Sequence, residues 1–158
     1  VLRTVEQGYR AVSEPRAAGV MTSVQDPRRE FERKVRTLIR GLTTLFAYAH
    51  TLNPFRYGMF AFLLFSHKVL RWTAPLFLAG ALVSALVLST RPLYLAAFIA
   101  QAACYAVAFA SLRRWGGLHR SAVGRIALYF SSANAAVLVA WIQYLRGVRQ
   151  ELWTPSQR

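Results

Sequence analysis

A basic segment near the middle of the first half of the chain has the residue types needed to bind phosphate. The stretch EFERKVRTLIRG, residues 30–41, places Arg33, Lys34, Arg36 and Arg40 beside a series of apolar residues. On a helix of about 100° per residue, the apolar side chains fall within an arc of about 120° and the arginines gather opposite them. Guanidinium groups bind phosphate oxygens through paired hydrogen bonds. The segment is therefore predicted to be a two-faced helix. This pattern is typical of a helix in the membrane interface, with apolar side chains among lipid tails and arginines in water or among lipid phosphates, and also of a surface helix on a soluble core; the apolar stretches that follow favour the interface.

Carboxylates are distributed unevenly, and this restricts the chemistry. The 158 residues include 20 Lys and Arg against 6 Asp and Glu, a formal net charge of +14. Five of the acids precede Arg33, and the next is Glu151. Because Mg²⁺ and Ca²⁺ need oxygen ligands and most acid/base pairs need a carboxylate, residues 33–150 cannot supply either alone. We expect no catalytic residue and no metal site in this chain.

The cysteine and the histidines do not indicate a metal site either. A single cysteine, Cys104, excludes an intrachain disulfide and a cysteine-based zinc cluster. His50, His67 and His119 lie beside basic groups, which disfavours metal binding. The chain starts at Val1 without the pattern of a signal peptide, and we expect it to be a fragment of a longer protein.

Two proline signals divide the first half of the chain. Residues 1–25 are too few for a domain and read as a short helical tail stopped at Gly8, followed by extended pieces. Asp26-Pro27 is a helix start, and the helix should run to about His50. Asn53-Pro54 opens a second helix, which ends near Trp72. Its apolar centre is too short to cross a bilayer, so residues 26–72 are predicted to form two interface helices, anchored by Lys68, Arg71 and Trp72.

Three apolar stretches follow, and each is long enough to span a membrane. They cover about residues 73–89, 93–112 and 126–145 within a region 73–146, with Pro75 in the first turn of the first span and a tail at 147–158. A soluble helical protein is disfavoured because these helices have no polar face. The connection at 113–125 carries four arginines and no acid, so this loop and residues 1–72 should be cytoplasmic. The tail is also basic, although three spans would place it outside, so its side stays open.

Polar and small residues inside the spans are expected to face protein. Gln101, Ser131, Ser132, Asn134 and Gln143 should form hydrogen bonds between helices or, less favoured, contact a substrate. Two pairs of small residues have the spacing of close helix contacts, and they are Gly80 with Ser84 and Ser132 with Ala136.

Several segments together resemble a known family. They are GYRAVSEPRAA, EFERKVRTLIRG, LNPFRYGMFAFLLFSHKVLRW, YFSSANAAVLVAWIQYLRG and WTPSQR, and SHKVLRW and RKVR are the specific parts. In this order they resemble the C-terminal half of membrane-bound family 2 glycosyltransferases of the cellulose, hyaluronan and chitooligosaccharide synthase type. The resemblance implies a mainly α membrane fold, with two amphipathic interface helices, a three-helix transmembrane bundle, and residues 1–25 as the α/β remnant of a cytoplasmic GT-A domain.

The resemblance also implies a binding role for the basic segment. The family has a Gln-x-x-Arg-Trp motif on its interface helix, where it helps to bind the acceptor or the donor diphosphate. Arg36 matches the family arginine, whereas Arg33 and Thr37 stand in place of the Gln and the Trp. Arg36 is the first candidate, with Arg33, Lys34 and Arg40 beside it. Lys34 and Arg40 are also placed to meet lipid phosphate.

The implied activity is inverting transfer of sugar from a nucleotide-sugar donor to a glycan or lipid acceptor, in a bacterial inner membrane. Mg²⁺ or Mn²⁺ with the nucleotide sugar is implied for the full-length enzyme, whose catalytic carboxylates would precede Val1, so this chain alone is expected to be inactive. The alternative is a non-catalytic small membrane protein, such as a flippase subunit or an assembly partner. Nucleic-acid binding is disfavoured, because the arginines are spread over both ends and the loops without a recognised module. The sugar, acceptor, linkage and oligomeric state stay open.

Overall fold

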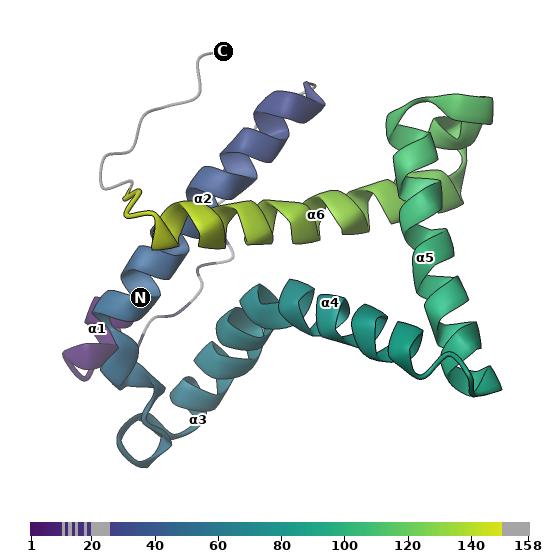
Figure 1. Ribbon diagram of the computed structural model, residues 1–158. Coiled ribbons are helices and arrows are strands. Elements are labelled where there is room, and N and C mark those ends of the chain that lie inside the picture. Colours follow the sequence, from purple (N-terminus) through teal and green to yellow (C-terminus); the bar gives the residue numbers. More distant parts are fainter. Residues whose placement is uncertain (11, 13, 15, 18, 20–25, 150–158) are drawn as a thin grey trace. The chain divides into compact units, whose positions relative to one another are not determined.

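The protein is mainly helical, as the computed structural model in Figure 1 shows. The structure describes residues 1–10, 12, 14, 16, 17, 19 and 26–149. Within these residues there is no strand. The chain divides into two compact units, of which the first combines Val1–Arg71 with the segment from Ala140 onwards and the second is Trp72–Val139.

A short helix lies at the start of the N-terminal segment. Helix α1, Leu2–Glu6, ends just before Gly8, whose φ of +82° is a left-handed conformation that glycine adopts readily. The helical tail and its stop at Gly8 are confirmed. The predicted α/β remnant is not shown, since the described positions between 9 and 19 form no strand and several others of the expected extended pieces lie outside the described residues.

The two proline signals begin helices as predicted. In helix α2, Pro27–Ala47, the Asp26 carboxylate accepts a hydrogen bond from the Arg28 backbone N–H at 2.9 Å. In helix α3, Pro54–Leu64, the Asn53 side chain accepts one from the Phe55 N–H at 2.9 Å. Each cap satisfies an amide that the helix leaves without an internal partner. Helix α2 ends three residues before the predicted His50, because a 3₁₀ turn, η1 (Ala49–Leu52), follows it.

The predicted break after Trp72 is wrong. Helix α3 continues through a π-helical turn, η2 (Phe65–Leu70), directly into helix α4, Arg71–Val87. The result is a run of 34 residues from Pro54 to Val87 that is helical except for a kink at Gly58, whose φ is +50°. Pro75 therefore lies inside a helix and not in a first turn. Wide π turns insert an extra residue without ending the helix, and the sequence has no stop signal between Leu64 and Trp72 that would have ended it.

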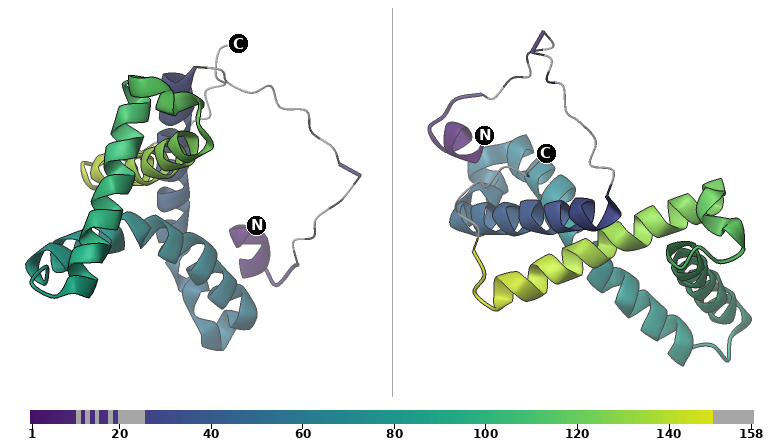
Figure 2. Two further views of the ribbon diagram at one scale, coloured as in Figure 1. Left: turned by 90° about the vertical axis from the view of Figure 1, so that its right-hand side faces the viewer. Right: turned by 90° about the horizontal axis from the view of Figure 1, so that it is seen from above.

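The second unit contains helix α5, Pro92–Leu112, and most of helix α6, Ala122–Leu145. Helix α5 agrees with the predicted 93–112, and the last residues of α6 belong to the first unit. Between them lies a 3₁₀ turn, η3 (Trp115–Arg120), shown in green in Figure 2. Helix α6 begins four residues before the predicted 126. Ser121 explains the difference, because its hydroxyl accepts a hydrogen bond from the Gly124 N–H at 3.0 Å and caps the helix earlier.

Within the described residues, three helical segments are long and apolar enough to cross a bilayer: Pro54–Val87, Pro92–Leu112 and Ala122–Leu145. The 21 residues of α5 give a length of about 31 Å, close to the thickness of the hydrocarbon core. Large apolar side chains on these segments are exposed, including Phe77 at 64%, Leu93 at 76% and Ile126 at 69%. Lipid would remove this apolar surface from water. These features indicate a membrane protein.

Candidate functional site

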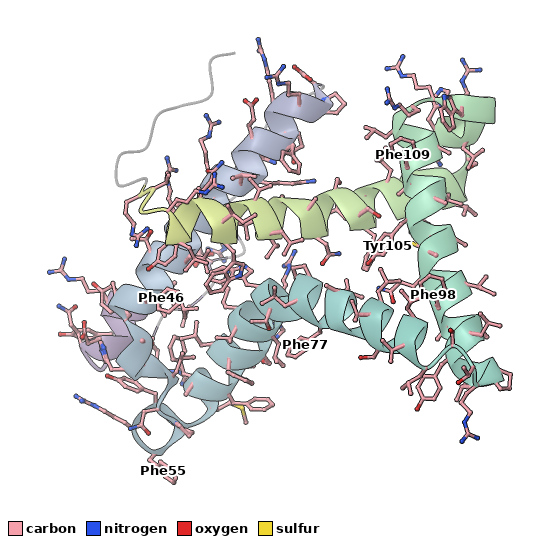
Figure 3. The ribbon with its side chains drawn as sticks, viewed as in Figure 1. Phe46, Phe55, Phe77, Phe98, Tyr105 and Phe109 are labelled. Carbon is pink, nitrogen blue, oxygen red and sulfur yellow. The ribbon has the colours of Figure 1, made fainter. Side chains whose placement is uncertain are left out.

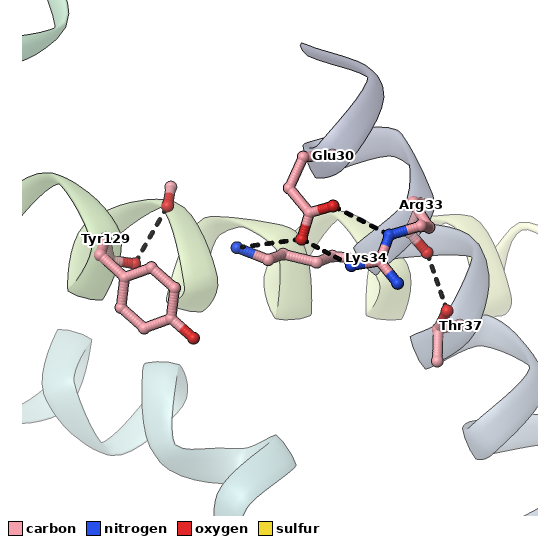
Figure 4. Close-up of polar contacts among 6 residues, drawn as sticks. Glu30, Arg33, Lys34, Thr37 and Tyr129 are labelled. Carbon is pink, nitrogen blue, oxygen red and sulfur yellow. Dashed lines mark hydrogen bonds and ion pairs between the residues drawn. The ribbon is translucent and has the colours of Figure 1, made fainter. Parts of the chain in front are cut away.

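In the first turns of α2, some of the positive side chains pair with carboxylates of the same helix. Arg33 donates two hydrogen bonds to the Glu30 carboxylate, from Nε and Nη2, each at 2.8 Å. The Lys34 ammonium lies 3.9 Å from the same carboxylate (Figure 4). Residues three or four apart lie on one helix face, so this arrangement follows from the spacing 30, 33, 34. Two of the candidate phosphate ligands are thus engaged by one carboxylate.

The same pair changes the acid strength of both partners. Hydrogen bonds from Arg33 are the main reason that the pKa of Glu30 lies below its ordinary value of 4.5, and the charges of Arg33 and Lys34 lower it further. In turn, the hydrogen bonds to Glu30 raise the pKa of Arg33. Glu30 therefore stays ionised at neutral pH and keeps Arg33 in an ion pair.

Two further arginines of α2 face carboxylates at its exposed start. Arg28 Nε lies 3.3 Å from Glu32, and Arg29 Nε lies 3.7 Å from Asp26. Their side chains are 88% and 68% exposed, so solvent screens these pairs and they contribute little stability. All three acids between residues 26 and 32 are thus occupied by neighbours on the same helix.

Arg36 differs from these neighbours. Its side chain is half-buried, and it forms no ion pair or hydrogen bond with any residue that the structure describes. Arg40, also half-buried, follows one helical turn later. A guanidinium group is always charged, and partial burial reduces the screening of its charge by water. Arg36 is therefore the basic residue of this segment that has free capacity for an added anion.

Burial shows how the apolar face of α2 is used. Val35, Ile39, Leu42 and Leu45 are buried, with Ile39 and Leu42 almost fully enclosed. The sequence predicted this stripe correctly but placed it among lipid tails. In the structure these four side chains are covered by protein, whereas Phe46 at the end of the helix is 51% exposed.

The three predicted anchors lie along η2 and the start of α4. Lys68 and Arg71 are exposed, as an interface anchor must be. Trp72, in contrast, is only 8% exposed and packs inside the protein. Its indole therefore contributes to packing, and Trp72 is a poorer candidate for contact with lipid headgroups than the two cations.

An aromatic cluster in the first unit was missed by the sequence analysis. Phe46 at the end of α2 stacks on Tyr144 near the end of α6, with ring centroids 5.3 Å apart, and Trp141 meets Phe46 edge-on at 6.0 Å (Figure 3). The Arg149 guanidinium lies 3.8 Å from the centre of the Tyr144 ring. Such contacts add stability beyond simple burial, and they join helix ends far apart in the sequence. The signal was present as aromatic residues at two helix ends, but their pairing depends on the fold.

The side chains that commonly bind metal ions are scattered over the described residues. Nowhere in the described part of the chain do three His, Cys, Asp or Glu side chains come together as a metal site. A metal ion of the kind that the resemblance implies would need ligands from outside these residues, since Mg²⁺ and Mn²⁺ prefer oxygen donors.

Comparisons with known proteins leave the chain without an assigned family. No family model, no curated protein and no solved structure matches it. The class that the structure defines is a helical membrane protein with three candidate spans.

Proposed function

We propose that this chain is the C-terminal, membrane-anchored part of a family 2 glycosyltransferase that guides the acceptor or the product. Support comes from the order of the resembling segments, which covers the whole chain, and from the apolar helices that follow the basic helix α2. In this proposal, a GT-A domain on an earlier part of the protein binds the nucleotide sugar. Residues 1–72 and the loop 113–125 lie on the cytoplasmic side of a bacterial inner membrane.

The observation that carries the proposal is the state of Arg36. Glu30 binds Arg33 and lies close to Lys34, whereas Arg36, at the position of the family arginine, has no carboxylate partner among the described residues. Charge-assisted hydrogen bonds from a half-buried guanidinium to phosphate are strong. Arg36 would bind diphosphate oxygens and stabilise the charge that builds on the nucleoside diphosphate while an acceptor hydroxyl displaces it.

The test uses the gene with its natural upstream sequence, expressed in cells, and membranes isolated from them. Transfer from radiolabelled nucleotide sugars to membrane-bound acceptors is measured for the wild type, Arg36→Ala and Arg36→Lys. We expect Arg36→Ala to lower the rate by about 100-fold or more, as for loss of other groups that stabilise transition-state charge. Arg36→Lys should retain part of the activity, because it keeps the charge but not the paired donors.

Arg28→Ala serves as the matched control. This residue lies on the same helix but is 88% exposed and paired with Glu32. Its activity should stay within about twofold of the wild type, since exposed pairs contribute little. Full activity of Arg36→Ala with normal membrane insertion would remove Arg36 from the site. Absence of transfer by wild-type membranes with every donor would favour the non-catalytic alternative.

A further inference from the structure

The connection between α5 and α6 concentrates positive charge without any internal counter-ion. We call residues 113–125 the arginine loop, and its four arginines are Arg113, Arg114, Arg120 and Arg125. All four are exposed. The second unit, Trp72–Val139, contains no Asp or Glu at all. Because a guanidinium group does not lose its proton in proteins, the counter-ions of this loop must come from outside the unit.

The backbone of the loop is held tightly between the two helices. A Cβ atom placed on Gly124 would collide with the Leu118 carbonyl oxygen and with Ser111 Oγ. Gly124 and Ser111 are both buried. Ser121 Oγ donates a hydrogen bond to the Leu118 carbonyl at 2.8 Å, which fixes the end of the turn. The loop backbone that carries the arginine side chains is therefore held in place by close contacts.

Two of the four arginine side chains are also placed by contacts. The Arg113 guanidinium lies 5.5 Å from the centre of the Phe109 ring, and Phe109 meets Trp115 edge-on at 5.8 Å (Figure 3). Arg125 Nη1 donates a hydrogen bond to the Arg120 carbonyl at 2.8 Å. Restriction of a side chain before binding lowers the entropy lost when a ligand is bound.

The surroundings of the loop favour a lipid over a soluble anion. The loop joins two helices that are long and apolar enough to span a bilayer. Trp115 is 60% exposed and Val123 is 69% exposed. Tryptophan is enriched at the level of lipid headgroups, where an apolar ring and phosphate groups meet. A soluble anion would satisfy the arginines but leave these apolar side chains in water.

We propose that the arginine loop is a binding site for anionic phospholipid headgroups, with guanidinium groups paired to the lipid phosphate and Trp115 at the headgroup level. Basic residues close to an anionic membrane surface gain about fivefold in affinity each. A preference for anionic over zwitterionic lipid should follow. This site does not depend on glycosyl transfer, so the two proposals fail independently.

The experiment measures lipid binding to the purified full chain by native mass spectrometry from a neutral detergent. Phosphatidylglycerol and phosphatidylcholine with identical acyl chains are titrated, and the dissociation constant of the first bound lipid is determined. In the variant Arg113→Gln/Arg114→Gln/Arg120→Gln/Arg125→Gln, the affinity for phosphatidylglycerol should fall by about 30-fold or more. The affinity for phosphatidylcholine should not change, which also shows that the variant is folded.

Two controls separate a built site from net charge. The variant Arg10→Gln/Arg28→Gln/Arg29→Gln/Arg56→Gln removes the same charge elsewhere, and its affinity for phosphatidylglycerol should stay within about threefold. The four loop arginines replaced by lysine should give an intermediate affinity, since lysine binds phosphate as a point charge. An equal loss in the charge control overturns the proposal. Displacement of phosphatidylglycerol by millimolar inorganic phosphate would assign the loop to a soluble anion and also overturn it.

Discussion

Helix α2 and the arginine loop are both rich in arginine, but they differ in whether carboxylates of the protein lie close to the guanidinium groups. On α2, the Glu30 carboxylate forms an ion pair with Arg33 and lies close to the Lys34 ammonium. Asp26 and Glu32 lie close to the two arginines at the helix start. The arginine loop belongs to a unit without a single carboxylate. Three carboxylates on or next to α2 thus balance half of its six positive charges, whereas the loop depends on an external anion.

This difference shows that net charge alone does not identify a binding surface. A total of +14 describes the chain, but the local carboxylates decide which arginines have capacity for a ligand. On α2 this leaves Arg36 as the candidate, and in the loop it leaves all four arginines. Rigidity also differs, because the loop is fixed at Gly124, where no other side chain fits.

The largest effect is expected from Gly124→Ala. The added methyl group would collide with a backbone carbonyl, which cannot move aside as a flexible side chain can. We expect a loss of about 3 kcal/mol in the free energy of unfolding, the upper part of the range for overpacking, measured by denaturant titration in detergent. Gly80→Ala is the control, because nothing lies within 4 Å of its added Cβ, and it should be neutral or stabilising. Equal effects at both glycines would mean that the loop is not rigid.

Substitution of the capping residues tests whether the N-terminal caps of α2 and α6 contribute equally to stability. Asp26→Ala and Ser121→Ala each remove the acceptor for a backbone N–H, at 2.9 Å and 3.0 Å. Each substitution should lower the free energy of unfolding by about 1 kcal/mol, as measured by thermal denaturation. Asp26→Asn and Ser121→Asn keep a capping oxygen and should restore most of the loss. A negligible effect of Ser121→Ala would show that the loop is fixed by Gly124 alone.

A smaller effect is expected inside the apolar helices of the second unit, where Gln101 is held by hydrogen bonds and not by an ion pair. Gln101 Nε2 donates to the Leu78 carbonyl at 2.8 Å and lies 3.1 Å from the Tyr105 hydroxyl, so the predicted contact between helices is confirmed for Gln101, whereas Ser132 and Asn134 donate to carbonyls of their own helix. Gln101→Met should cost about 0.6 kcal/mol in unfolding free energy, typical of such bonds in membranes. Tyr105→Phe should cost less, because the bond to Leu78 remains. A larger loss for Tyr105→Phe than for Gln101→Met would mean that the bond to Tyr105, and not the bond to Leu78, contributes most of the stability.

The smallest effect concerns the pH dependence of α2. The pKa of Glu30 is lowered in the folded protein, so its pair with Arg33 stabilises fully above the ordinary value of 4.5 and loses this contribution as the pH falls below it. The pair joins partly exposed side chains, and its contribution should be about 0.5 kcal/mol. An NMR titration of the Glu30 carboxyl should give a midpoint below 4.5. Arg33→Gln should move the midpoint up, whereas Arg28→Gln should not.

Helix starts that depend on neighbouring residues were predicted well from the sequence, whereas close packing between distant residues was not. Asp26-Pro27 and Asn53-Pro54 mark helix starts because capping depends on neighbours two or three residues away. The continuity of α3 with α4 and the early start of α6 were missed, since a π turn and a serine cap have weaker patterns. For close packing, the sequence indicated Gly80, but the structure shows open space there and a tight contact at Gly124.

The candidate site shows the same division. The sequence by itself determined the helical class, the apolar spans, the separation of acids from most of the arginines and the choice of Arg33, Lys34, Arg36 and Arg40, because composition and periodicity are local properties. Only the tertiary structure decided that Glu30 engages Arg33 and approaches Lys34, that Trp72 is buried, and that Phe46 meets Tyr144. These outcomes depend on side-chain rotamers and on contacts between residues distant in the chain, which a one-dimensional pattern does not specify.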